Sequence, residues 1–122
     1  MSFSDLKLLG NQSSVISSGG SLYPEYQCRA WVKFVGTGSV TAVVGGNIST
    51  VSYNGTGDYI VNFTVAFPDT DYVANAANKQ QAVNLGGINY ISVKNTGSCR
   101  HITINEVQAA RDQDYVLISY FR

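Results

Sequence analysis

His101 is the only histidine of the chain, and histidine is the side chain best suited to general acid–base chemistry near neutral pH. It alternates along the sequence with Ile102 and Ile104. That period of two predicts that His101 faces away from the core, together with Thr103 and Asn105. A catalytic base also needs a nucleophile or a carboxylate beside it, and the sequence indicates neither. We therefore expect a surface or interface histidine in a protein that is not an enzyme.

Two aspartate pairs, Asp69 with Asp71 and Asp112 with Asp114, could offer oxygens to a cation. Neither pair has the glycine and the distal glutamate of a calcium loop, so we expect turn residues instead. The cysteines and the histidine lack the spacing of a zinc site. The Gly-Thr-Gly segments at 36–38 and 55–57 have no following helix N-terminus to receive a phosphate, and they predict hairpin turns. No metal or other cofactor is predicted.

The composition predicts a single domain and excludes two classes of partner. The chain has 122 residues, with 8 Lys and Arg against 8 Asp and Glu, so it lacks the basic excess of a nucleic-acid-binding protein. No apolar run approaches the ~20 residues that span a bilayer, and the first residues lack the apolar region of a signal peptide. We expect no membrane insertion and folding in the cytosol of the cell that makes the protein. Cys28 and Cys99 are then expected to be reduced and buried, with a disulfide between them as the alternative.

From Cys28 onward the sequence is typical of β-strands. Val, Ile, Thr, Tyr and Phe fill short runs that Gly-, Asn- and Asp-rich turns separate. The predicted strands are 28–35, 39–44, 48–54, 59–67, 72–77, 88–94, 101–107 and 115–121, and the stretch 75–81 could instead hold a helical turn. Tyr59, Val61, Phe63, Val65 and Phe67 would share one buried face. Eight short strands at this spacing predict an all-β, antiparallel β-sandwich or jelly-roll-like domain over residues 28–122.

Two of these strands carry apolar residues whose cover the sequence leaves open. In the first, Cys28, Ala30, Val32 and Phe34 form a predicted core face, while the opposite face places Trp31 among charged residues. In the last, 115–121, both faces are apolar, so either the fold itself or another subunit must cover it. We predict a subunit interface at both, with packing within the domain and ligand binding as the alternatives for Trp31. The predicted interface residues are Trp31, Arg29, Lys33, Tyr115, Leu117, Tyr120 and Phe121.

Residues 1–27 differ from the rest and predict an N-terminal arm or attachment segment. Its middle is rich in Ser, Gly, Asn and Gln, which is typical of a linker. Spaced apolar residues could dock along a neighbouring molecule, although a partly disordered terminus is the alternative. The predicted docking residues are Leu6, Leu8, Leu9, Val15 and Ile16.

Several motifs occur in an order that resembles a known domain. They are Cys28-Arg-Ala-Trp-Val-Lys-Phe-Val-Gly-Thr-Gly38, Asn47-Ile-Ser, Tyr53-Asn-Gly-Thr-Gly-Asp-Tyr-Ile-Val-Asn-Phe-Thr64, Phe67-Pro-Asp69 and the closing Tyr120-Phe121-Arg122. Residues 27–122 thus resemble the C-terminal β-rich domain of tail-fibre and other appendage proteins of tailed bacteriophages. A tail fibre would have a long shaft before this domain. The 27 residues here favour a knob, a fibre tip or a decoration protein of the capsid or tail.

The resemblance implies a non-enzymatic virion structural protein that forms a homotrimer. Its partners would be further copies of itself and other capsid or tail proteins, and its location the virion, assembled in the host cytoplasm. The loops at 45–47, 54–58, 68–71 and 79–87 would be free to meet the host surface, where a glycan could be a further partner. The alternative is a carbohydrate-binding module that uses exposed aromatics and Asn/Asp loops; Trp31, Tyr53, Tyr90 and Tyr120 are its candidate aromatics.

Overall fold

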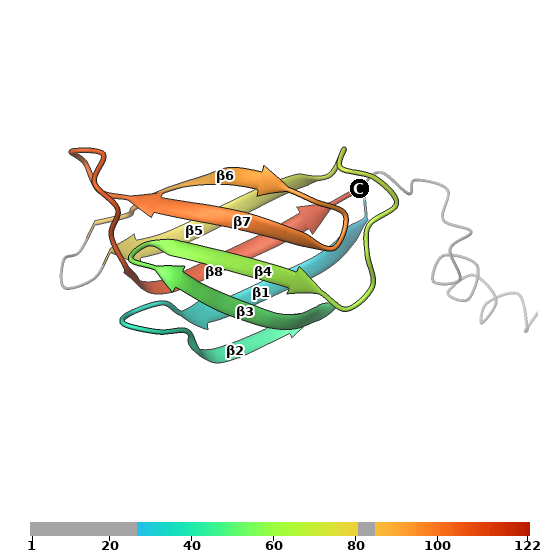
Figure 1. The fold of residues 1–122 in the computed structure, drawn as a ribbon, viewed down its shortest axis with the longest axis horizontal. Coiled ribbons are helices and arrows are strands. Elements are labelled where there is room, and N and C mark those ends of the chain that lie inside the picture. The colour runs from blue at the N-terminus through green and yellow to red at the C-terminus, as the bar shows by residue number, and fades with distance from the viewer. Residues whose placement is uncertain (1–26, 81–84) are drawn as a thin grey trace, which may run out of the picture.

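The computed structural model describes residues 27–80 and 85–122, and these form eight β-strands (Figure 1). Of the predicted arm, only Gln27 is described, so the docking residues Leu6, Leu8, Leu9, Val15 and Ile16 lie outside the described residues. The strands are β1 Cys28–Val35, β2 Thr41–Gly46, β3 Ile48–Gly55, β4 Asp58–Phe63, β5 Val73–Gln80, β6 Ile88–Lys94, β7 Ser98–Ile104 and β8 Gln113–Phe121.

The strands form two antiparallel sheets of four that pack face to face, which confirms the predicted all-β sandwich. Sheet A has the strand order β2-β1-β8-β5, and sheet B has the order β3-β4-β7-β6. Figure 1 shows sheet B in front of sheet A, with β2 and β3 together along one side of the sandwich and β5 and β6 along the other.

The core lies between the sheets and is built from the alternate residues that each strand turns inward. Part of the core is a cluster of aromatic side chains. In it the ring centroids of Phe67 and Tyr72 are 4.5 Å apart, and those of Phe63 and Tyr120 are 5.0 Å apart. Burial between the sheets raises the pKa of the Tyr120 hydroxyl far above its usual range. The buried apolar residues are Ala30, Val32, Phe34, Tyr59, Val61, Phe63, Phe67, Tyr72, Cys99, Val116, Ile118 and Tyr120.

The strands predicted at 59–67 and 101–107 extend beyond the turns at which the observed strands end. The strand predicted at 59–67 ends at Phe63, and Val65 lies on the surface with 67% of its area exposed, so its predicted place on the buried face is wrong. The strand predicted at 101–107 runs from Ser98 to Ile104 instead. The helical turn considered at 75–81 is absent from the described part of that stretch, since Val73–Gln80 is the edge strand β5 paired with β8.

The predicted core position of Cys28 is also wrong. Its side chain is exposed, whereas Cys99 is buried, and both are free thiols. The reason is a shift in the pairing of β1 with β8 between Cys28 and Ala30, which breaks the alternation at the start of the strand. Burial raises the pKa of the Cys99 thiol to about 11, so the predicted buried, reduced thiol describes Cys99 but not Cys28.

Asn47 forms the corner at which the chain leaves sheet A and enters sheet B. Its backbone has a φ of 58°, which asparagine tolerates better than other residues with a side chain. The Asn47 side-chain amide donates to the carbonyl oxygens of Arg29 and Val65, at 3.1 Å each. The backbone N–H of Val65 donates back to Asn47 Oδ1 at 2.7 Å. One residue therefore connects β1, the β2–β3 corner and the segment after β4.

Replacing Asn47 should destabilise the sandwich. Asn47→Ala removes three hydrogen bonds and places an alanine at a positive φ, so we expect the free energy of unfolding to fall by about 2–3 kcal/mol. Asn47→Gly removes the same hydrogen bonds but relieves the backbone, so its loss should be smaller by about 1 kcal/mol. Urea unfolding measures both variants. Equal stability of wild type and Asn47→Ala would show that this corner does not hold the sheets together.

Candidate subunit interface

The outer face of sheet A carries the residues that the sequence singled out most strongly. Alternation turns Trp31 and Lys33 of β1 outward, and the antiparallel register sets Lys33 opposite Leu117 and Trp31 opposite Ser119 of β8. Residues directly opposite each other in an antiparallel pair project to the same side. Trp31 is 46% exposed and Leu117 is 38% exposed. Two residues from opposite ends of the described chain thus form one apolar surface.

Strand β5 completes this surface with small side chains. Asn75 and Ala77 stand opposite Ser119 and Leu117, on the side of β8 away from β1. Because these residues are short, the surface is hollowed beside Trp31 into an open groove of about 460 Å³. The outer groove, as we call it, is lined by Trp31, Val32, Lys33, Asn75, Ala76, Ala77, Leu117, Ile118 and Ser119. Its lining is mostly apolar and contains one charged side chain.

Gly46 determines how Trp31 lies. Trp31 and Gly46 are paired across β1 and β2. A Cβ atom at Gly46 would stand 2.6 Å from the indole Nε1, so the ring occupies the space that a side chain there would need. The indole therefore lies across β2, and this is possible only because residue 46 is glycine.

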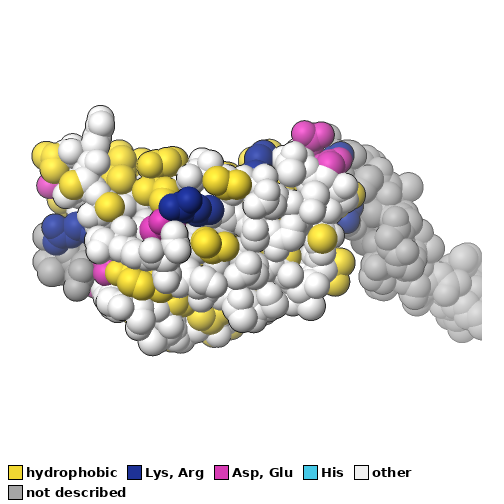
Figure 2. All heavy atoms as spheres, in the orientation of Figure 1, with side chains coloured by type: hydrophobic (Ala, Val, Ile, Leu, Met, Phe, Trp, Pro, Cys, Tyr) yellow, Lys and Arg dark blue, Asp and Glu magenta, His cyan; other side chains and the backbone are white. Residues whose placement is uncertain are grey.

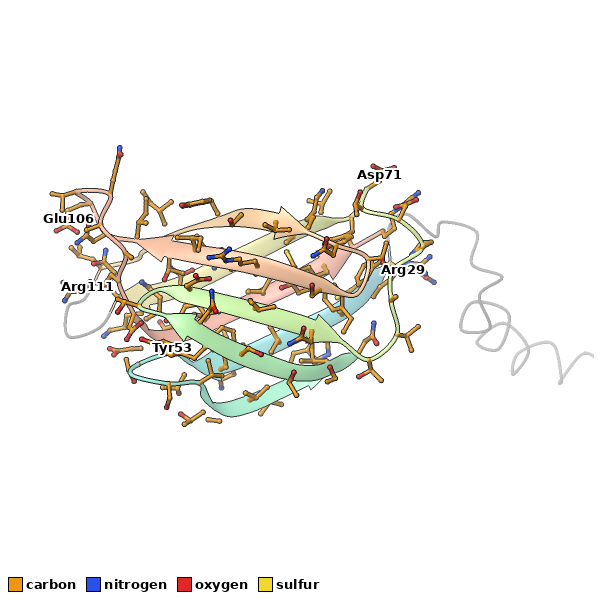
Figure 3. All side chains as sticks on the ribbon, in the orientation of Figure 1. Arg29, Tyr53, Asp71, Glu106 and Arg111 are labelled. Atoms are coloured by element: carbon orange, nitrogen blue, oxygen red, sulfur yellow. The ribbon has the colours of Figure 1, made fainter. Side chains whose placement is uncertain are left out.

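Of the other predicted interface residues, Tyr115 lies on the outer face of sheet A, Arg29 and Phe121 lie at the end of that sheet, and Tyr120 is buried. Tyr115 is 42% exposed on the same outer face, opposite Lys79 of β5. Arg29 and Phe121 are half-buried at the end of sheet A. The Nε of Arg29 donates to the Arg122 carbonyl oxygen at 2.6 Å. Figure 3 shows Arg29 at the same end of the sandwich as Asp71, and Tyr53, Glu106 and Arg111 at the other end.

Tyr120 is not on the outer face, and its predicted role in the interface is wrong. Its side chain is fully buried in the core and 0% exposed. In β8 the residues Val116, Ile118 and Tyr120 point inward while Tyr115 and Leu117 point outward. Both faces of this strand are apolar in sequence because one face contacts sheet B and the other lines the outer groove.

The expected surface position of His101 is also wrong. His101 is 1% exposed and Thr103 is 0% exposed, whereas Ile102 and Ile104 are half-buried on the outer side of sheet B. His101 and Thr103 thus face the core while Ile102 and Ile104 face outward, the reverse of the usual pattern. The Thr103 hydroxyl donates to the Arg111 carbonyl oxygen at 2.7 Å, and hydrogen bonds to both ring nitrogens of His101 likewise compensate for its burial.

His101 belongs to a chain of polar side chains that crosses the interior. Its Nδ1 is 2.9 Å from Asn89 Oδ1, and its Nε2 is 2.7 Å from the Tyr120 hydroxyl. Because the Asn89 oxygen accepts, Nδ1 carries the proton and Tyr120 donates to Nε2. The Asn89 amide then donates to Asn78, which donates to Gln113 Oε1 at 3.1 Å. Both hydrogen-bond partners of the imidazole are uncharged, so His101 is neutral. Its hydrogen bond with Tyr120 connects β7 of sheet B to β8 of sheet A.

Stability should depend on pH through His101. Burial lowers its pKa from 6.5 to about 4, so the unfolded chain binds the proton at a higher pH than the folded chain. The stabilisation is fully present above pH 6.5 and is lost as the pH falls toward 4. We expect the free energy of unfolding to fall by up to about 1.4 kcal/mol per pH unit within this window.

Urea unfolding at a series of pH values measures this slope, and His101→Gln is its control because glutamine does not titrate. The ordinary pKa of an aspartate is 3.8, and ion pairs lower the pKa values of Asp58 and Asp69, so these groups act only at the acid end of the window. An unchanged slope in His101→Gln would refute the assignment.

The aspartate pairs hold turns by hydrogen bonds. Asp112 is 8% exposed and accepts from the backbone N–H groups of Gly38 and Gly57, at 3.0 and 2.8 Å, and from the Tyr53 hydroxyl at 3.1 Å. Asp69 forms an ion pair with Arg122, which lowers the pKa of its carboxyl to about 2. Within 27–80 and 85–122, no three His, Cys, Asp or Glu side chains gather as a metal site would require.

The outer face of sheet B carries a second set of exposed apolar residues. Ile88, Tyr90 and Val93 of β6 are 54%, 48% and 42% exposed. Figure 2 shows hydrophobic side chains gathered over β6 and β7, beside basic and acidic side chains near the middle of this face. The ion pair of Arg100 with Asp58, 2.6 Å between nitrogen and oxygen, lies on this outer face and interrupts its apolar surface.

Comparison with models of protein families, with curated proteins and with solved structures finds no match to this chain. In the described part of the chain, no helix has the length and apolar character needed to cross a membrane.

The sequence missed the contribution of β5 to the outer groove and of Gly46 in β2 to the placement of Trp31. Asn75, Ala77 and Gly46 carry no chemistry that would single them out, and their importance comes only from the strands beside which they lie. The one available signal was the run of small residues Ala74–Ala77, which leaves one face of a strand open to a neighbour.

Proposed function

We propose that this chain is a non-enzymatic structural protein of a tailed-bacteriophage virion that assembles into a homotrimer through the outer face of sheet A. The observation that supports the proposed self-assembly is the outer groove, in which Trp31 and Leu117 expose apolar surface beside small residues. Exposed aromatic and aliphatic groups around a hollow are typical of interface hot spots. A net charge of zero gives no electrostatic opposition to self-association.

The virion assignment rests on the resemblance of residues 27–122 to the C-terminal domains of phage appendage proteins. A knob, a fibre tip and a decoration protein remain the particular forms of this proposal, with capsid or tail proteins as further partners. Mass spectrometry of purified particles that encode the chain tests the location directly: the protein should be a stoichiometric component. Its absence from such particles would refute the assignment.

Self-assembly should depend on Leu117. Leu117→Glu places a carboxylate in the outer groove, opposite Lys33 on the same face, so the domain should still fold. We expect self-association to weaken about 30-fold or more, which is the loss of about 2 kcal/mol typical of a hot spot. Light scattering after size exclusion measures it. Ala109→Glu, in an exposed turn, is the matched control and should stay trimeric. A monomeric wild type at micromolar concentration would refute the proposal.

A carbohydrate-binding module is the second candidate, and the position of Trp31 favours it. The indole lies across β2 with Asn75 and Ser119 in the same groove, an arrangement that can stack on a sugar ring. The other candidate aromatics do not extend this platform. Tyr120 is buried, Tyr53 is half-buried against Asp112, and Tyr90 lies on the opposite sheet.

A glycan array distinguishes the two functions. Glycan binding that disappears in Trp31→Ala, with the oligomeric state unchanged, would favour the carbohydrate-binding module. We expect the reverse result: Trp31→Ala weakens self-association, and wild type shows no binding that depends on the indole.

A further inference from the structure

The side of the sandwich formed by β2 and β3, here called the β2–β3 edge, is exposed and uncharged, and nothing in the described part of the chain covers it. Every residue of β2 except Gly46 is exposed, and Val43 and Val44, on its two faces, are 42% and 54% exposed. Strand β2 is the end strand of sheet A, so the hydrogen-bonding groups along its outer side have no neighbouring strand. An exposed apolar edge strand is a ready site for pairing with another chain.

Charge is absent from this edge. The 24 residues from Phe34 to Gly57, which include all of β2 and β3, contain no Asp, Glu, Lys, Arg or His. Proteins usually protect free sheet edges with charged residues, especially lysine, or with proline. The opposite side of the sandwich follows that rule, since β5 carries Lys79 and β6 ends at Lys94. The β2–β3 edge lacks the protection that the other edge has.

The two strands of this edge lie close together and present a joint surface. Gly45 and Ile48 flank the corner at Asn47, and a Cβ atom at Gly45 would stand 2.8 Å from the Cγ1 of Ile48, so the two strands pack against each other at this corner. Val43 projects beside this contact, away from the outer face of sheet A, because it lies one residue before Val44, which is opposite Lys33. The edge thus exposes apolar side chains of β2 beside uncharged polar side chains of β3, and it brings no charge of its own to a contact.

Ring symmetry requires a surface of this kind. A cyclic assembly of more than two copies uses a heterologous contact, in which each copy offers two unlike patches. The outer faces of sheets A and B point in opposite directions, and joining them would stack copies into a filament. The β2–β3 edge is about perpendicular to the outer face of sheet A, so pairing the edge of one copy with the face of the next lets a small ring close.

We infer that the β2–β3 edge of one copy, with Val43 at its centre, packs into the outer groove of a second copy of this chain. This inference rests on the proposed self-assembly and names the second surface that the assembly needs. The open groove of about 460 Å³ has room for aliphatic side chains of the size of valine. The small residues Asn75, Ala77 and Ser119 let a partner strand approach the sheet closely. The edge brings no charge to the contact, and Lys33, the one charged residue of the groove lining, is exposed and its long side chain can keep the ammonium group in water.

Two single variants and their mixture test the inference by sedimentation velocity on the full chain. Leu117→Glu disables the groove and leaves the edge intact, while Val43→Glu disables the edge and leaves the groove intact. Each variant alone should lose the trimer, with self-association about 30-fold weaker or more. Mixed at equal amounts and high concentration, they should form a 1:1 heterodimer, because one intact edge still meets one intact groove. Ala109→Glu should remain trimeric, and thermal unfolding confirms that every variant is folded.

The possible outcomes separate this inference from the proposed function. If Val43→Glu stays trimeric while Leu117→Glu does not, the groove is an interface but the edge is not its partner, and the inference is overturned alone. If both are monomeric yet do not associate when mixed, the two surfaces do not meet each other, and the inference is again overturned. If Leu117→Glu stays trimeric, the proposed interface itself is wrong. Tyr90→Glu on sheet B should stay trimeric, and its dissociation would assign the contact to that face instead.

Discussion

The pairing of β8 with two neighbours is the constraint on which the rest of the structure depends. This strand pairs with β1 on one side and β5 on the other, so it occupies the middle of sheet A. Its inward residues contact sheet B, and Tyr120 bonds to His101 across the interface between the sheets. Its outward residues, above all Leu117, form the floor of the outer groove. One strand thus contributes both to the core and to the proposed contact between copies.

The interior is held by polar as well as apolar contacts. His101, Asn89, Asn78 and Gln113 form a connected chain between the sheets, and Asp112 joins three turns at one end of the sandwich. Such groups are costly to bury unless each has a partner, so they favour a single relative position of the two sheets. His101 and Asp112, which the sequence offered as candidates for chemistry, therefore stabilise the fold through hydrogen bonds. The exposed surface of sheet A is left with mainly apolar residues.

Much of the fold could be predicted from local patterns, and the limits of that prediction have physical causes. The period of two in Ala30–Phe34 and in Tyr59–Phe63 identified their buried faces correctly, because each of these strands has one clearly apolar side. Alternation failed at Cys28, where a bulge shifts the pairing, and at Val65, where the chain turns after β4 ends at Phe63. Neither the bulge nor the turn leaves a signal in the residues nearby.

The sequence by itself determined that this protein is all-β, that Trp31 and Lys33 share the outward face of a strand, and that few charges oppose association. These features depend on residue type and on the two-residue period of a strand, which are local. Only the tertiary structure decided which face of β7 and β8 is buried. Both faces of β8 are apolar, and β7 alternates polar with apolar in the inverse sense, so burial depends on which strands lie opposite. The positions of Tyr120, His101 and the outer groove follow from that packing, because a strand's own residues do not specify what covers them.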